Sequence, residues 1–169
     1  MKIAVLGVGN VLLSDEGLGV RVVEEIRKRY SLPEEVLLID GGTLGLSLLY
    51  FLEGVERLLV VDAVLGGLPP GSLYKFKGEE VLTYFKSRKL SAHDIGIQEV
   101  LALADLTDRL PKEIVVLGLE PESFEISLDL SPSVKNNLDR LIEEVISQLK
   151  EWNVEVRDEA GEPFGASSP

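Results

Sequence analysis

The stretch KIAVLGVGNVLLSDEGLG, residues 2–19, decides the fold of this chain. Residues 2–8 form a short apolar run rich in branched side chains, which is typical of a strand buried on both faces of a parallel sheet. The glycine loop that follows leads to Ser14 and Asp15, two residue types that favour the start of a helix. Apolar residues then recur at helical spacing over residues 16–30. A strand, a glycine loop and a helix in this order predict the first unit of an α/β fold.

The rest of the chain continues this alternation. Apolar runs predict buried strands at 35–40, 57–64 and 113–119, an antiparallel or edge strand at 73–77 and a small edge strand at 124–130. Helices are predicted at 44–52, 79–86, 95–106 and 132–152. We therefore predict a three-layer α/β fold, in which a twisted, mostly parallel sheet of about five strands carries helices on both faces. Residues 1–152 are expected to form a single domain, followed by a flexible tail at 153–169.

Composition excludes several classes of function. The chain has 169 residues, a net charge of -12 and no cysteine. Without cysteine there is no disulfide framework, zinc ribbon, iron–sulfur site or thiol nucleophile. The negative charge argues against binding to nucleic acid or to an anionic membrane surface. No apolar run approaches the ~20 residues that span a bilayer, and the N-terminus enters a strand without a visible signal peptide, so we expect a cytoplasmic protein.

Glu16, Asp62 and His93 are the candidate site residues. Each follows a predicted strand or stands in the loop after one, and the carboxyl ends of parallel strands share one crevice where ligands bind. Two carboxylates and an imidazole that meet there can hold a divalent metal ion. Each residue also has a simpler interpretation. Glu16 would complement a helix dipole, Asp62 would cap a turn, and His93, the only histidine, would be a surface or capping residue.

Other schemes of binding and catalysis fit the residues less well. Gly7 and Gly9 supply two glycines of a dinucleotide-binding G-x-G-x-x-G motif and Asp40 resembles its ribose-binding acid, but Leu12 stands at the third glycine position. The acids at 15 and 16 also disfavour phosphate at the helix start. A two-histidine zinc site lacks its second histidine. A serine triad lacks its G-x-S-x-G elbow, and the DGGT stretch at 40–43 only partly matches the D-T-G loop of pepsin-like proteases.

Five motifs together resemble those of the hydrogenase maturation endopeptidases. They are GVGNVLLSDEGLG at 7–19, DGGT at 40–43, VVDA at 60–63, SAHD at 91–94 and VLGLEP at 116–121. The first motif is fairly specific because it joins a glycine loop to a D-E-G-x-G helix start. The other four gain weight as an ordered set that extends over about residues 1 to 150.

This resemblance implies both an activity and a site. It implies a single-domain α/β endopeptidase whose catalytic groups are of the aspartic type. The enzyme would remove the C-terminal extension of a nickel-iron hydrogenase large-subunit precursor after nickel insertion. The family's metal-contacting positions fall on Glu16, Asp62 and His93, which would recognise nickel presented by the precursor, and no organic cofactor is implied. The loop at 11–13 and the helix start at Leu44 are candidates for docking the precursor. A nickel metallochaperone or carrier that never cuts, and a mononucleotide-binding protein, remain alternatives.

Overall fold

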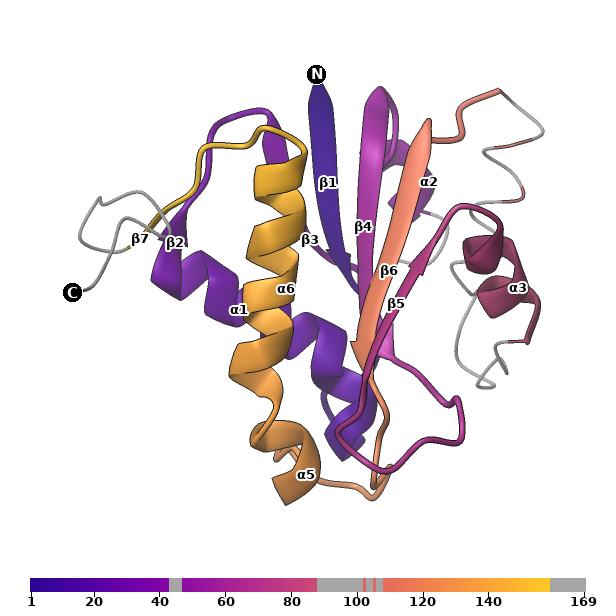
Figure 1. Cartoon of the computed structure of the whole chain (residues 1–169), viewed down its shortest axis with the longest axis vertical. Coiled ribbons are helices and arrows are strands. Elements are labelled where there is room, and N and C mark those ends of the chain that lie inside the picture. The colour runs from indigo at the N-terminus through magenta and orange to yellow at the C-terminus, as the bar shows by residue number, and fades with distance from the viewer. Residues whose placement is uncertain (43–46, 88–101, 103–104, 106–107, 159–169) are drawn as a thin grey trace.

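The computed structural model describes residues 1–42, 47–87, 102, 105 and 108–158. A five-stranded sheet runs through the middle of the molecule and helices cover both of its faces (Figure 1). The predicted three-layer α/β class is therefore confirmed. Among the described residues, no helix is both long enough and apolar enough to cross a membrane.

The sheet consists of β1 (Lys2–Gly7), β3 (Val36–Asp40), β4 (Val55–Ala63), β6 (Glu113–Leu119) and β5 (Leu73–Lys77). Their order across the sheet is β3-β1-β4-β6-β5. The first four strands are parallel, and β5 pairs antiparallel with β6, as the sequence predicted for an edge. The parallel strands are continuous apolar runs because helices cover both of their faces. All four finish at the same edge of the sheet, which we call the carboxyl edge.

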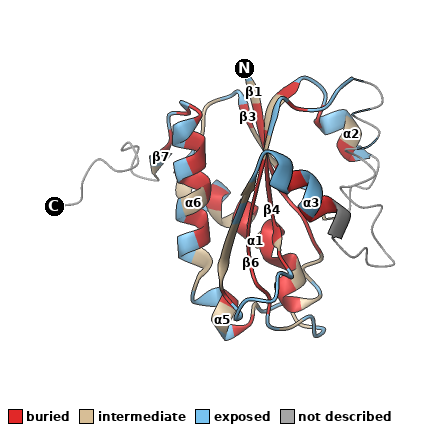
Figure 2. Ribbon diagram, turned by 45° about the vertical axis from the view of Figure 1, so that its right-hand side comes forward, coloured by how far each residue is buried: buried red, intermediate tan, exposed pale blue. Residues whose placement is uncertain are grey.

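Helices α1 (Leu18–Arg29) and α6 (Leu138–Glu151) cover one face of the sheet, and α2 (Ser47–Phe51) and α3 (Glu79–Ser87) cover the other. Their buried sides face the strands and their exposed sides face solvent (Figure 2). Alternate residues of β4 divide between the two cores. Val61 packs on the α1 and α6 side, whereas Val60 packs on the α2 and α3 side.

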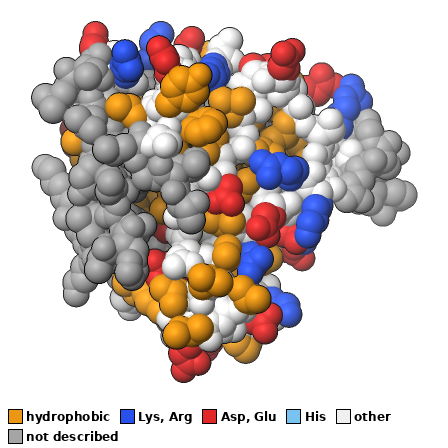
Figure 3. All heavy atoms as spheres, turned by 180° about the vertical axis from the view of Figure 1, so that it is seen from behind, with side chains coloured by type: hydrophobic (Ala, Val, Ile, Leu, Met, Phe, Trp, Pro, Cys, Tyr) orange, Lys and Arg blue, Asp and Glu red, His pale blue; other side chains and the backbone are white. Residues whose placement is uncertain are grey.

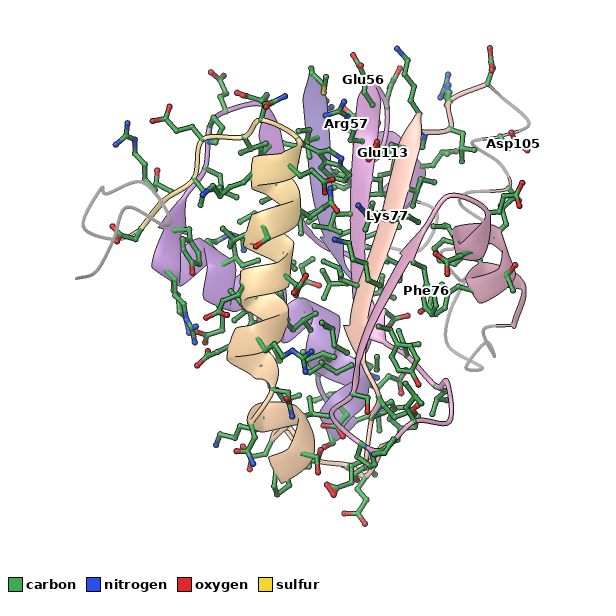
Figure 4. All side chains as sticks on the ribbon, in the orientation of Figure 1. Glu56, Arg57, Phe76, Lys77, Asp105 and Glu113 are labelled. Atoms are coloured by element: carbon green, nitrogen blue, oxygen red, sulfur yellow. The ribbon has the colours of Figure 1, made fainter. Side chains whose placement is uncertain are left out.

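At the opposite end of the strands, the amino edge of the sheet, separate contacts of Trp152 join α6 to the sheet. Trp152 Nε1 donates a 2.6 Å hydrogen bond to Glu113 Oε2, and the Arg57 guanidinium lies 5.8 Å from the centre of the Trp152 ring. Figure 4 shows Glu56, Arg57 and Glu113 near this edge, far from the ends of the strands that build the site. The end of α6 is thereby fixed to the start of β6.

The single helix predicted at 132–152 is wrong in one respect, because two helices occupy this stretch. A short α5 (Pro132–Lys135) ends before α6 begins at Leu138. Asn137 lies between them with a ψ of 4°, and its Nδ2 donates to the Ser133 carbonyl oxygen at 2.8 Å. Asparagine side chains compete with the helix for backbone partners in this way, so the chain turns once before α6.

The small strand predicted at 124–130 is also wrong. Only one bridge forms there, between Leu13 and Ser127. The Oγ atoms of Ser123 and Ser127 accept hydrogen bonds from the backbone N–H groups of Glu125 and Asp129, two residues further on in each case. These local turns take up backbone donors that a continuous strand would need.

Packing continues beyond residue 152, where we predicted the domain to end. Val154 and Val156 are buried in the core on the α6 side. β7 (Arg157–Asp158) pairs antiparallel with β2 (Tyr30–Ser31). The core therefore includes the first residues of the predicted tail. Residues 159–169, most of the helix predicted at 95–106, and Leu44 lie outside the described residues.

Candidate functional site

The candidate site lies where β1 and β4 finish side by side at the carboxyl edge. In the sheet, the chain continues from β1 to β3 on one side and from β4 to β5, beyond β6, on the other side, so the two outgoing connections diverge between β1 and β4. The Val8 N–H donates to the Val61 carbonyl oxygen at 3.0 Å and keeps the two strand ends together. Such a switch point is where open α/β sheets bind their ligands.

Asp62 is the second-last residue of β4 and is only 3% exposed. Its Oδ2 accepts a 2.6 Å hydrogen bond from Tyr84 Oη of α3, and its Oδ1 accepts a 2.9 Å bond from the Ala63 N–H. The bond from Ala63 fits the simpler interpretation, a cap at the end of the strand, but the bond from Tyr84 and the burial go beyond it. A buried carboxylate needs such donors because burial without them is costly.

Tyr84 is held by aromatic neighbours as well as by Asp62. Its ring stacks on Phe76 of β5 with centroids 5.3 Å apart, and it lies 5.1 Å from the Phe85 ring. Figure 4 shows Phe76 on β5, on the side of the strand that faces α3. The packing of three rings fixes the position of the phenol oxygen, and the phenol in turn orients one oxygen of Asp62.

Glu16 reaches the same region from the other strand. It is half-buried in the short 3-10 helix η1 (Ser14–Gly17), which precedes α1 and contacts β4. Gly9 makes this approach feasible. Its φ is 124°, and a side-chain carbon placed on it would lie 1.7 Å from the Glu16 carbonyl oxygen. The glycine loop thus folds directly over Glu16. The helical spacing began at residue 16 in the sequence, but Glu16 precedes α1 and does not lie within it.

A second glycine allows the start of α1 to pack against the strand ends. A side-chain carbon on Gly19 would lie 2.1 Å from the Val61 carbonyl oxygen, next to Asp62. The G-x-G and D-E-G-x-G spacings of the first motif therefore serve close backbone packing. They bring η1 and the end of β4 to the same edge, as the sequence predicted for Glu16 and Asp62.

His93 lies outside the described residues, so its meeting with Glu16 and Asp62 stays a prediction. Across the part of the chain that the structure describes, no group of three or more acidic or histidine side chains is arranged to hold a metal ion. Two carboxylates and one imidazole would make an open site that accepts further ligands from a partner.

Asp15 has a role that sequence reasoning missed. The expectation that Ser14 and Asp15 cap a helix is wrong, because neither side chain bonds to η1 or to α1. The fully buried Asp15 carboxylate accepts four hydrogen bonds of 2.7–3.0 Å, from the N–H groups of Glu122, Ser123 and Ser131 and from Ser131 Oγ. It ties η1 to residues 122–131 and adds a buried negative charge beside Glu16, which disfavours phosphate there.

Glu120 is a second buried carboxylate that sequence reasoning left without a role. Its Oε1 accepts hydrogen bonds from the N–H groups of Gly66 and Leu68 and from Tyr74 Oη, at 2.7–3.0 Å. Burial and this bond to Glu120 raise the pKa of Tyr74, so its phenol remains a donor. Glu120 thereby fixes the loop after β4. Glu120 directly follows the buried strand predicted at 113–119. An acid at the end of an apolar strand is the signal that singled out Asp62, and the same signal could have singled out Glu120.

Asp40 is exposed at the end of β3, and its Oδ1 accepts a hydrogen bond from the Gly42 N–H at 3.0 Å. The Gly41 N–H donates to the Gly7 carbonyl oxygen at 2.8 Å. Asp40 therefore closes a turn beside β1. In the dinucleotide interpretation Asp40 would bind a ribose. The structure instead shows Asp40 in a structural role.

Comparison with known proteins gives one consistent result. Residues 20–148 match a protein-family model described as hydrogenase maturation protease. The chain is 43% identical over 156 residues to the hydrogenase expression/formation protein HupD of Bradyrhizobium diazoefficiens, which covers 92% of this chain and 81% of the relative. It is 39% identical over 156 residues to the hydrogenase 2 maturation protease of Escherichia coli, with coverage of 92% and 94%.

Solved structures agree with the sequence matches. The hydrogenase maturating endopeptidase HybD from Escherichia coli superposes with a TM-score of 0.88 at 38% identity, covering 95% of this chain and 99% of that one. The NiFe hydrogenase maturation protease HybD from Thermococcus kodakarensis gives a TM-score of 0.72 at 28% identity, with coverage of 88% and 99%. Both similarities extend over nearly the whole of the solved chains.

Proposed function

This chain belongs to the hydrogenase maturation protease family, and we propose that it removes the C-terminal extension of a nickel-iron hydrogenase large-subunit precursor. The observation that supports this most is the buried Asp62 carboxylate, which Tyr84 orients at the switch point. The 3-10 helix η1 brings Glu16 to the same region. Membership of a peptidase family gives the reaction class, and the carboxylates of Glu16 and Asp62 are groups that can carry it out.

In this proposal, Glu16, Asp62 and His93 recognise nickel that the precursor already holds. Carboxylate and imidazole groups suit a divalent ion of this kind. Nickel is part of the substrate here and anchors the precursor so that the scissile peptide lies beside the two acids. A precursor that has not received nickel would lack these bonds. The dependence of cleavage on nickel insertion would follow from that loss of binding.

Cleavage itself then needs water and a base. Glu16 or Asp62 would accept the proton of a water molecule as its oxygen attacks the carbonyl carbon of the scissile peptide. The tetrahedral intermediate collapses, the C–N bond breaks, and the proton passes to the leaving amine. In this respect the reaction is of aspartic type, because carboxylates carry the proton and no protein nucleophile forms a covalent intermediate.

The proposal is tested by incubating the purified protein with two forms of one cognate large-subunit precursor, with nickel and without it. Mass spectrometry should show that only the nickel-loaded precursor loses the mass of its C-terminal extension. Binding of the loaded precursor without any loss of mass would indicate a nickel carrier instead of a protease. Equal cleavage of the two precursor forms would refute recognition through nickel.

A further inference from the structure

We propose that residues 122–130, together with Leu12, form a docking edge for an extended segment of the precursor that is apolar and basic. This inference rests on the proposed function, since it names the surface through which the same site receives its substrate. Four side chains of this docking edge are strongly exposed. They are Ile126 at 90%, Leu128 at 62%, Leu12 at 58% and Phe124 at 43%.

The burial of this segment does not follow the usual pattern, because most of its apolar side chains are exposed. Alternating apolar and polar residues normally turn the apolar side to the core. Here the half-buried Ser127 pairs inward with Leu13, while its neighbours Ile126 and Leu128 face solvent. The register of that bridge also places Leu12 beside Ile126. An exposed apolar group of this kind is expected at an interaction surface.

The segment is held firmly to the loop that carries the candidate site. The Ser127 N–H donates to the Leu12 carbonyl oxygen at 3.0 Å, and the Ser14 N–H donates to the Ser127 carbonyl oxygen at 2.9 Å. Ser14 Oγ donates to the carbonyl oxygen of Asp129 at 2.7 Å, and Arg21 Nη2 donates to that of Leu128 at 2.9 Å. The segment therefore lies directly against the loop that leads into Glu16, which follows Ser14 by two residues.

Charge and position indicate the occupant. Exposed acids alternate with the apolar residues of the docking edge, namely Glu122, Glu125 and Asp129. An extended partner segment that carries both apolar residues and Lys or Arg would match both features. Hydrophobic side chains also gather at the lower end of the molecule, where the parallel strands finish (Figure 3). Because this edge is continuous with the proposed site, its occupant is the precursor that the site acts on.

The test measures kinetics of processing with nickel-loaded precursor for Ile126→Asp and for a control, Tyr50→Asp. Tyr50 is 76% exposed on α2, which leads into the start of β4 at the amino edge. We expect Ile126→Asp to raise KM about tenfold or more, with a smaller effect on kcat, as at the centre of an interface. The control should behave as the wild type. An unchanged KM for Ile126→Asp would overturn the docking edge, whereas a wild type that does not cleave would overturn the proposed function itself.

Two further measurements test the charge and the position of the docking edge. The double change Glu125→Lys and Asp129→Lys should raise KM, and a lower KM would overturn the basic chemistry assigned to the partner. A photo-crosslinking amino acid at position 126 should join the protein to the precursor. If it instead joins two copies of this protein, and Ile126→Asp dissociates that pair without changing KM, the surface is a dimer contact and the proposal fails.

Discussion

Tyr84 Oη donates a 2.6 Å hydrogen bond to Asp62 Oδ2, and both side chains are buried. The bond joins α3 to the end of β4 across 22 residues of sequence. Tyr84 is thus a positioning residue for one of the proposed site's two acids. A carboxylate fixed in one orientation can meet an incoming metal ion without first losing conformational freedom.

Tyr84→Phe should lower kcat/KM for the nickel-loaded precursor by about tenfold, the lower end of the range for a lost partner of a metal ligand. The phenylalanine ring keeps the stacking on Phe76, but the buried Asp62 carboxylate loses a donor, so the melting temperature should also fall by about 4 °C or more. Tyr50→Phe, which removes an exposed phenol, is the matched control, and equal effects of the two changes would rule out a positioning role.

Asp15 gives a prediction about stability. Asp15→Asn replaces one acceptor oxygen by an N–H₂ group among the backbone donors of Glu122, Ser123 and Ser131. We expect the free energy of unfolding to fall by about 3 kcal/mol, because a buried charged network loses acceptors and leaves donors unpaired. Urea unfolding measures this. The control Asp108→Asn alters an exposed acid at a φ of 57°, which asparagine tolerates, and should stay within about 0.5 kcal/mol of the wild type.

Removal of metal should leave the fold intact. Two apolar cores, one on each face of the sheet, hold the described elements together, and protein donors already satisfy Asp62. Addition of a chelator should therefore not change the melting temperature of the free protein. A fall of about 4 °C or more, equivalent to about 1 kcal/mol for a domain of this size, would show that a metal ion is structural.

Local signals in the sequence were sufficient for most of the sheet. Strands buried under helices on both faces are apolar throughout, so β1, β4 and β6 are visible as continuous runs. The antiparallel edge strand β5 is visible as an alternating run. Glu16 and Asp62 could be placed at one edge because every parallel strand ends there. That step uses topology alone and needs no knowledge of side-chain contacts.

Contacts between distant residues could not be predicted in this way. The helical pattern of α3 places Tyr84 on a buried face, but nothing in it shows that the phenol reaches Asp62. Alternation at 124–130 predicted a strand, and the serine turns that divert its backbone depend on contact with Leu12 and Ser14. Asp15 resembled a helix cap because its partners, about 107 residues or more further along, have no sequence signal of their own.

In the proposed mechanism, Glu16, Asp62 and His93 act together on nickel held by the precursor. The most direct test combines Glu16→Gln, Asp62→Asn and His93→Ala in one folded protein and follows the mass of the nickel-loaded precursor. We expect the wild type and the control Glu143→Gln, on the exposed side of α6, to shorten the precursor, whereas the triple variant should leave its mass unchanged. Shortening by the triple variant at the rate of the wild type would show that these three residues are not the site.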